Sequence, residues 1–125
     1  MPGVRLLVVE DEQIILLSLV RMLERLGCEV VAQASSGPEA VEQARAAQPE
    51  VVLMDVRLAG NTSGVDAARQ IRTFSNVPII FATAHASVLA EDLSQWQSAV
   101  YAVAKPFSPS QLKAMIEQVR PRAGQ

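Results

Sequence analysis

Five polar side chains with the chemistry of a metal or phosphate site each stand at the end of a short apolar run. Glu10 and Asp11 follow the first run, and Asp55 follows the third. Thr83 follows the fourth run and Lys105 follows the fifth. If these runs are parallel strands of one sheet, their carboxyl ends meet at one edge, where the five side chains converge. Three carboxylates in one cleft repel each other, so the pattern indicates a site that binds a cation.

The residue types indicate which cation and which reaction. Carboxylate oxygens without histidine or cysteine are typical ligands of Mg²⁺, which keeps positions free for water and phosphate oxygens. Asp55 could then act as a nucleophile and form an aspartyl-phosphate. The metal, Thr83 and Lys105 would stabilise charge on the transferred phosphoryl group. Because phosphorylation adds about two negative charges, the site is also typical of a phosphate-triggered switch.

Each of these residues also has an ordinary structural interpretation. Asp11 or Glu12 could cap the first helix, Thr83 could be a turn residue, and Lys105 could end a loop. For any one residue alone the structural interpretation is favoured. The presence of all five at one edge favours a functional site.

Short apolar runs alternate with longer stretches of helical periodicity. The runs are rich in β-branched residues and apolar nearly throughout, which is typical of strands covered on both faces. They are Val4–Val9, Val30–Ala34, Val51–Met54, Val77–Ala82 and Ala99–Ala104. The alternation predicts an α/β fold, a doubly wound five-stranded parallel sheet flanked by five helices.

Start and stop signals delimit the predicted helices. The first carries Ile15, Leu19, Met22 and Leu26 at intervals of three and four, and Gly27 follows as a stop. The other four are predicted after the serine caps Ser36 and Ser63, within Ser87–Gln97, and after the cap Ser108.

Length, charge and cysteine content exclude several classes of protein. The 125 residues amount to about one domain, which we expect over residues 1–120, with residues 121–125 as a short flexible tail. A net charge of -2 argues against binding to nucleic acid. One cysteine excludes an internal disulfide, and no apolar run reaches the ~18 residues of a membrane span. We therefore expect a cytoplasmic protein without a signal peptide.

With these features the sequence resembles the receiver domain of bacterial two-component response regulators. The resemblance covers almost the whole chain, from about Arg5 to Val119. It depends on four motifs in a fixed order, namely Glu10-Asp11, Asp55 after Val51–Met54, Thr83-Ala84, and Lys105-Pro106-Phe107. It implies a flavodoxin-like sheet with the strand order 2-1-3-4-5.

The resemblance also implies how phosphate and metal are bound. Asp55 would accept a phosphoryl group from a histidine kinase or from a relay phosphotransfer protein. Glu10, Asp11, Asp55 and the main-chain carbonyl of Arg57 would hold Mg²⁺. Thr83 would hydrogen-bond the phosphoryl group and move with it.

The fifth strand carries one expected feature and one departure from the family. Lys105 would pair with Asp55 or its phosphate, and the Lys105–Pro106 peptide bond would be cis. Many receivers have a switch aromatic three residues before this lysine, where this chain has Ala102; Tyr101 stands one place earlier. Because strand side chains alternate, we expect the Tyr101 ring on the opposite face of the sheet.

These interpretations predict a stand-alone receiver that signals by phosphorylation-dependent protein binding. The expected partners are a histidine kinase or phosphotransfer protein and a downstream protein target, without nucleic acid or membrane. The target would contact the face formed by the fourth helix, fifth strand and fifth helix. We expect a monomer or a phosphorylation-dependent dimer, and no enzymatic activity beyond phosphorylation and dephosphorylation of the chain itself.

Three alternatives use the same residues differently. A Mg²⁺-dependent phosphohydrolase would form the same aspartyl-phosphate, but such enzymes usually have a second aspartate where Arg57 stands. A flavodoxin-like electron carrier would need a hydroxyl-rich phosphate loop after the first strand, where this chain has Glu10-Asp11-Glu12. A degenerate receiver would serve only as a docking module.

Overall fold

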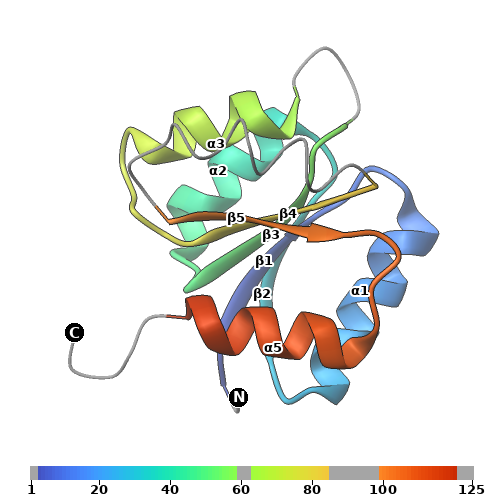
Figure 1. Ribbon diagram of the computed structural model, residues 1–125. Coiled ribbons are helices and arrows are strands. Elements are labelled where there is room, and N and C mark those ends of the chain that lie inside the picture. Colours follow the sequence, from blue (N-terminus) through green and yellow to red (C-terminus); the bar gives the residue numbers. More distant parts are fainter. Residues whose placement is uncertain (1–2, 59–62, 85–98, 121–125) are drawn as a thin grey trace.

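One five-stranded parallel sheet forms the centre of the computed structural model, which describes residues 3–58, 63–84 and 99–120 (Figure 1). The strands are β1 (Arg5–Val9), β2 (Glu29–Ala34), β3 (Val51–Asp55), β4 (Ile79–Thr83) and β5 (Val100–Ala104). Their order across the sheet is β2-β1-β3-β4-β5, and every neighbouring pair is parallel. The predicted sheet and its strand order are confirmed.

Helices cover both faces of this sheet (Figure 1). The four in the described part of the chain are α1 (Gln13–Arg25), α2 (Gly37–Ala47), α3 (Gly64–Arg72) and α5 (Pro109–Val119). Helices α1 and α5 lie on one face, and α2 and α3 lie on the other. The predicted helix within Ser87–Gln97 and the predicted tail lie outside the described residues. None of the described helices is long and apolar enough to cross a membrane.

Successive residues of the central strands belong to two separate apolar layers. Leu6 and Val8 of β1 pack with α1 and α5, whereas Leu7 and Val9 pack with α2 and α3. All four side chains are almost completely buried. Because both faces of the sheet are covered, these strands are apolar throughout instead of alternating with polar residues.

Serine side chains fix the starts of three helices, as predicted. Ser36 accepts a hydrogen bond from the backbone N–H of Glu39 at 3.3 Å, and Ser63 accepts one from Asp66 at 3.1 Å. Glu12 occupies the N-cap position of α1, but its side chain makes no capping hydrogen bond. Gly27, the predicted stop after α1, has a φ of 90°, which favours glycine.

The buried stripe of α1 coincides only in part with the apolar spacing seen in the sequence. The buried residues are Leu16, Leu19, Val20 and Leu23. Of the four residues at helical spacing, Leu19 is buried, Met22 and Leu26 pack half-buried against the same core, and Ile15 is 37% exposed. Helix α1 is apolar on more than one side, so the spacing of its apolar residues does not determine which side faces the sheet.

Helix α5 begins with a complete capping box. Ser108 accepts a hydrogen bond from the Gln111 backbone at 3.1 Å, and the Gln111 side chain accepts one from the Ser108 N–H at 2.7 Å. We predict that Ser108→Ala lowers the free energy of unfolding by about 1 kcal/mol, because it leaves a helix N–H without its partner. Urea unfolding measures this change. The matched variant Ser110→Ala, exposed in the same turn, should leave stability nearly unchanged; equal losses in both would contradict the assignment.

Candidate functional site

The carboxyl edge of the sheet gathers the polar residues that end its strands. Glu10 follows β1, Asp55 ends β3, and Thr83 ends β4. Lys105 follows β5, and its backbone N–H donates to the carbonyl of Thr83 at 2.8 Å. Hydrophobic packing buries β3 and β4, and the half-buried Asp55 and Thr83 are the first polar residues at their carboxyl ends. The structure therefore places them at one edge, as the sequence predicts.

Lys105 connects two of the carboxylates. Its Nζ donates a hydrogen bond to Oδ2 of Asp55 at 2.7 Å and lies 3.7 Å from Oε1 of Glu10. Burial alone would lower the pKa of Lys105, but the hydrogen bond and charge of Asp55, together with Glu10, raise it above its ordinary value. The lysine is therefore held as an ammonium ion. The second Asp55 oxygen, Oδ1, accepts a hydrogen bond from the Arg57 N–H at 3.0 Å.

Glu10 is the most buried carboxylate of the site. It is 1% exposed, and its Oε2 accepts one long hydrogen bond, 3.4 Å, from the Glu12 N–H. Its Oε1 is buried without a hydrogen-bond partner in the described part of the structure. Burial is the main reason that the pKa of Glu10 rises to about 7, and a hydrogen bond with the Asp11 side chain and the charge of Asp55 add to it.

These groups fit a magnesium ion that keeps much of its water. All candidate ligands are oxygens, and Oε1 of Glu10 is a buried acceptor without a hydrogen-bond partner, with only the Lys105 ammonium 3.7 Å away as a positive neighbour. Asp11, the neighbour of Glu10, is exposed to solvent. In residues 3–58, 63–84 and 99–120, no group of three or more His, Cys, Asp or Glu side chains could hold a metal ion by itself. Mg²⁺ usually binds through one or two carboxylates and several waters, so this arrangement suits it.

The two residues around the missing switch aromatic lie on opposite faces of β5. Tyr101 packs against the apolar layer of α1 and α5. Ala102 packs against the layer of α2 and α3, so a methyl group stands where many receivers have a ring. The prediction that the Tyr101 ring lies on the opposite face is confirmed. The Lys105–Pro106 peptide bond is cis, as the resemblance implies.

Two features of the site region were not predicted from the sequence. Gly64, the first residue of α3, lies directly against the backbone of Asp55. On α1, Ile14 and Leu17 are 85% and 51% exposed, although both are large and apolar. The exposed apolar residues could have been predicted from the sequence, because α1 contains more apolar residues than a single buried stripe accommodates. The close approach of Gly64 to Asp55 could not have been predicted, since a glycine at a helix start is equally consistent with a simple turn.

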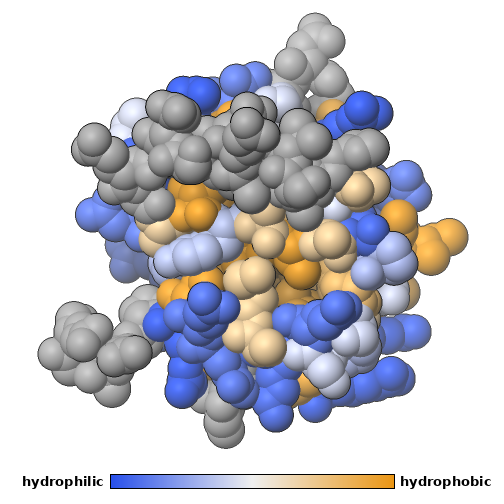
Figure 2. Space-filling model, viewed as in Figure 1, coloured by the Kyte–Doolittle hydropathy of each residue, from blue (hydrophilic) through white to orange (hydrophobic). Residues whose placement is uncertain are grey.

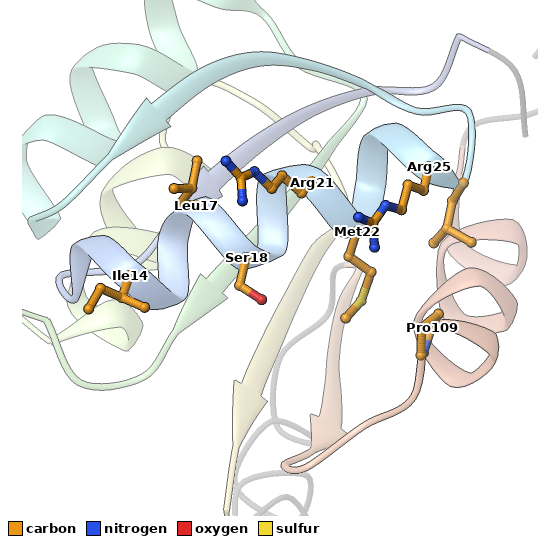
Figure 3. Close-up of a pocket in the computed structure, with 8 residues that line it drawn as sticks. Ile14, Leu17, Ser18, Arg21, Met22, Arg25 and Pro109 are labelled. Atoms are coloured by element: carbon orange, nitrogen blue, oxygen red, sulfur yellow. The ribbon is translucent and has the colours of Figure 1, made fainter.

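The exposed side of α1 borders a groove of about 400 Å³ that extends to the start of α5 (Figure 3). Ile14, Leu17 and Ser18 line one end, Met22 and Pro109 line the other, and Leu26 is a further lining residue. Arg21 and Arg25 also line it, so the groove combines an apolar surface with two positive charges. Figure 2 shows apolar atoms exposed among hydrophilic residues on the side of the molecule where α1 lies.

The strand order and the site at the carboxyl edge define a doubly wound, flavodoxin-like α/β domain. Within this class, residues 6–117 match the response regulator receiver domain family. The chain belongs to this family.

Curated relatives agree with this assignment. The chain is 37% identical over 113 residues to the transcriptional regulatory protein PdtaR of Mycobacterium tuberculosis. The matched region covers 90% of this chain and 55% of PdtaR. It is 33% identical over 114 residues to the phyllosphere-induced regulator PhyR of Methylorubrum extorquens, covering 90% of this chain and 42% of PhyR. The chain thus spans about half the length of these relatives.

Solved structures show the same fold. The receiver domain of PhyR from Erythrobacter litoralis has a TM-score of 0.79 at 31% identity and covers 98% of both chains. PhyR from Brucella abortus has a TM-score of 0.78 at 36% identity, covering 94% of this chain and 48% of that protein. In the longer protein the similarity is therefore confined to about half of the chain.

The raised pKa of Glu10 predicts a pH-dependent stability without metal. Between the ordinary pKa of 4.5 and about 7, folded Glu10 keeps a proton that the unfolded chain releases, so unfolding becomes easier as pH rises. We expect the free energy of unfolding to fall between pH 5 and pH 8, with Glu10 contributing at most about 3 kcal/mol. Urea unfolding in EDTA across this range measures the fall.

Glu10→Gln isolates the contribution of this one group. The variant should lose most of the fall, because its amide does not ionise. Glu117→Gln, an exposed position on α5, should keep the wild-type dependence. Identical pH profiles for Glu10→Gln and wild type would show that the Glu10 pKa is not raised.

Proposed function

We propose that the chain is a phosphoacceptor switch in which Asp55 takes a phosphoryl group from a phosphohistidine of a kinase or phosphotransfer protein. The observation that carries this proposal is the short contact from Lys105 to Asp55, 2.7 Å, beside a buried Glu10 oxygen without a hydrogen-bond partner. A nucleophilic carboxylate, an ammonium and a site for a cation are the groups that phosphoryl transfer to a carboxylate requires. Beyond its own phosphorylation and dephosphorylation, the chain has no substrate of its own, and it acts in the cytoplasm.

The reaction uses the carboxylate of Asp55 as the nucleophile. One oxygen attacks phosphorus and forms a P–O bond, while the P–N bond of the phosphohistidine breaks and the imidazole nitrogen leaves with the bonding pair. The Arg57 N–H orients Asp55 through Oδ1. Lys105 can transfer its hydrogen bond from Oδ2 to a phosphoryl oxygen without leaving the site, since its ammonium is compact and carried on a flexible stem.

Magnesium would be held by Glu10, Asp11, Asp55 and the main-chain carbonyl of Arg57. When bound, it would neutralise charge on the phosphoryl oxygens. Oε1 of Glu10 is buried without a hydrogen-bond partner, so it is available as a ligand. Ionised Glu10 is disfavoured by its surroundings, so a cation that pairs with it also relieves the burial of that charge.

The structural change caused by phosphorylation would be transmitted through the backbone of β4 and β5. Thr83, half-buried at the end of β4, would turn toward the phosphoryl group. Its carbonyl accepts a hydrogen bond from the Lys105 N–H, so both groups that respond to phosphate are joined by one backbone contact. With Ala102 in place of a ring, movement of this contact would alter the surface of β5 and α5, where the downstream protein would bind.

The groove on α1 is the surface that the phosphodonor would use. Helix α1 begins just beyond Glu10 and Asp11, so a partner seated on Ile14 lies next to the site. Ile14 and Leu17 supply apolar contact, and the positive charges of Arg21 and Arg25 favour a partner helix with acidic residues beside its apolar ones.

The central prediction concerns covalent phosphate on Asp55. Incubation with acetyl phosphate and Mg²⁺ should add one phosphoryl group per chain, seen by mass spectrometry, and Asp55→Asn should add none. Asp66→Asn, an exposed acidic residue of α3, should behave as wild type. Rapid multiple turnover of acetyl phosphate would favour the phosphohydrolase instead, and no incorporation in any variant would indicate a docking module.

A second prediction tests the docking surface. Arg21→Glu should slow phosphotransfer from a histidine kinase active on the wild type about tenfold, because it replaces an attraction by a repulsion. Phosphorylation by acetyl phosphate should not change, since this donor needs no docking. Lys113→Glu, which reverses an exposed charge on α5, is the control. Equal kinase rates for Arg21→Glu and wild type would place the donor elsewhere.

A further inference from the structure

Gly64 lies in direct contact with the residue that carries the proposed phosphoacceptor. It is the first residue of α3, it is buried, and its N–H donates to the Val56 carbonyl at 2.6 Å. A Cβ at this position would collide with the carbonyl oxygen of Asp55. It would also lie 3.1 Å from Cα of Val56 and 3.2 Å from the carbonyl carbon of Asp55. The first turn of α3 therefore approaches the Asp55 backbone so closely that only glycine, which has no Cβ, fits at position 64.

The requirement for glycine here is one of space and not of backbone conformation. Gly3 and Gly27 have positive φ angles among the described glycines, and Gly64 does not. The colliding atoms are backbone atoms, so no side chain could rotate away to make room. Any larger residue must move either α3 or the end of β3.

Neither of these elements can move independently of its packing. Helix α3 is held against the sheet by Ala67, Ala68 and Ile71, which are completely buried. Strand β3 pairs with β1 on one side and with β4 on the other. The displacement caused by a side chain at position 64 would therefore appear where the strand ends, at Asp55 and the turn that follows it.

We propose that Gly64 is a positioning residue, which lets α3 fix the Asp55 backbone at the place where its carboxylate meets both Lys105 and the incoming phosphorus. The inference builds on the proposed function. The Asp55 carboxylate makes two contacts, at 2.7 Å to Lys105 and at 3.0 Å to the Arg57 N–H. Both depend on where the Asp55 backbone lies. A shift of the Asp55 backbone misaligns the nucleophile, and displacements of about 1 Å are enough to slow such reactions markedly.

The test uses Gly64→Ala in the full chain, at a temperature where circular dichroism shows it folded. We expect the maximal rate of phosphorylation by acetyl phosphate, at saturating Mg²⁺, to fall at least about tenfold, with a smaller change in the KM for acetyl phosphate. Gly37→Ala is the matched control, because Gly37 is also buried at the first position of a helix after a serine cap. It should keep the wild-type rate. A folded Gly64→Ala with the wild-type rate would overturn the inference.

A second measurement does not depend on phosphorylation. The ¹⁵N NMR signal of the Lys105 ammonium reports its hydrogen bond to Asp55 directly, and Lys105→Arg assigns it. Gly64→Ala should shift or broaden this signal, and Gly37→Ala should not. If wild type takes no phosphate but Gly64→Ala still shifts the signal, the proposed function fails while the positioning role stands. An unchanged signal would overturn the positioning role.

A milder pair of variants serves if Gly64→Ala does not fold. Ser63→Ala removes the cap that holds the first turn of α3, and Ser36→Ala removes the same cap from α2. Loosening α3 should lower the phosphorylation rate and broaden the Lys105 signal, whereas loosening α2 should do neither. Equal effects from the two variants would show that α3 has no special part in placing Asp55.

Discussion

The contact between Lys105 and the two carboxylates around it organises the site. One ammonium lies 2.7 Å from Asp55 and 3.7 Å from Glu10, in surroundings from which much of the water is excluded. Burial is the main reason that the pKa of Glu10 is raised, a hydrogen bond with Asp11 and the charge of Asp55 add to it, and the ammonium of Lys105 offsets only part of the rise. The site is thus short of positive charge before any phosphate arrives, which is why a divalent cation suits it.

The fold produces this arrangement because a parallel sheet gathers the ends of its strands at one edge. Glu10 follows β1, Asp55 ends β3 and Lys105 follows β5, three strands that are far apart in sequence. The central strands β1, β3 and β4 are apolar and buried over most of their length. Charged groups therefore gather at their carboxyl ends, so the burial of the strands also determines where the site lies.

Much of this could be predicted from the sequence, and what could not has a physical reason. The strands, the serine caps and the convergence of Glu10, Asp55 and Lys105 follow from local patterns, and the strand order follows from the family resemblance. The side of α1 that faces the sheet did not follow, because that helix is apolar on more than one side. The role of Gly64 did not follow either, since a close approach between a helix and a strand end has no signature in residue type.

The position of Tyr101 determines how such a site can signal. A ring on the α2 and α3 face of β5 could swing toward Thr83 and carry the change outward, but this chain places Ala102 there and Tyr101 on the other face. Thr83 and Lys105, the groups that would respond to phosphate, are instead joined by backbone, through the Lys105 N–H and the Thr83 carbonyl at 2.8 Å. Backbone hydrogen bonds within a paired sheet move together with their strands. A switch built in this way would therefore act by small joint shifts of β4 and β5, and its output would be read on the α5 side, where Tyr101 packs.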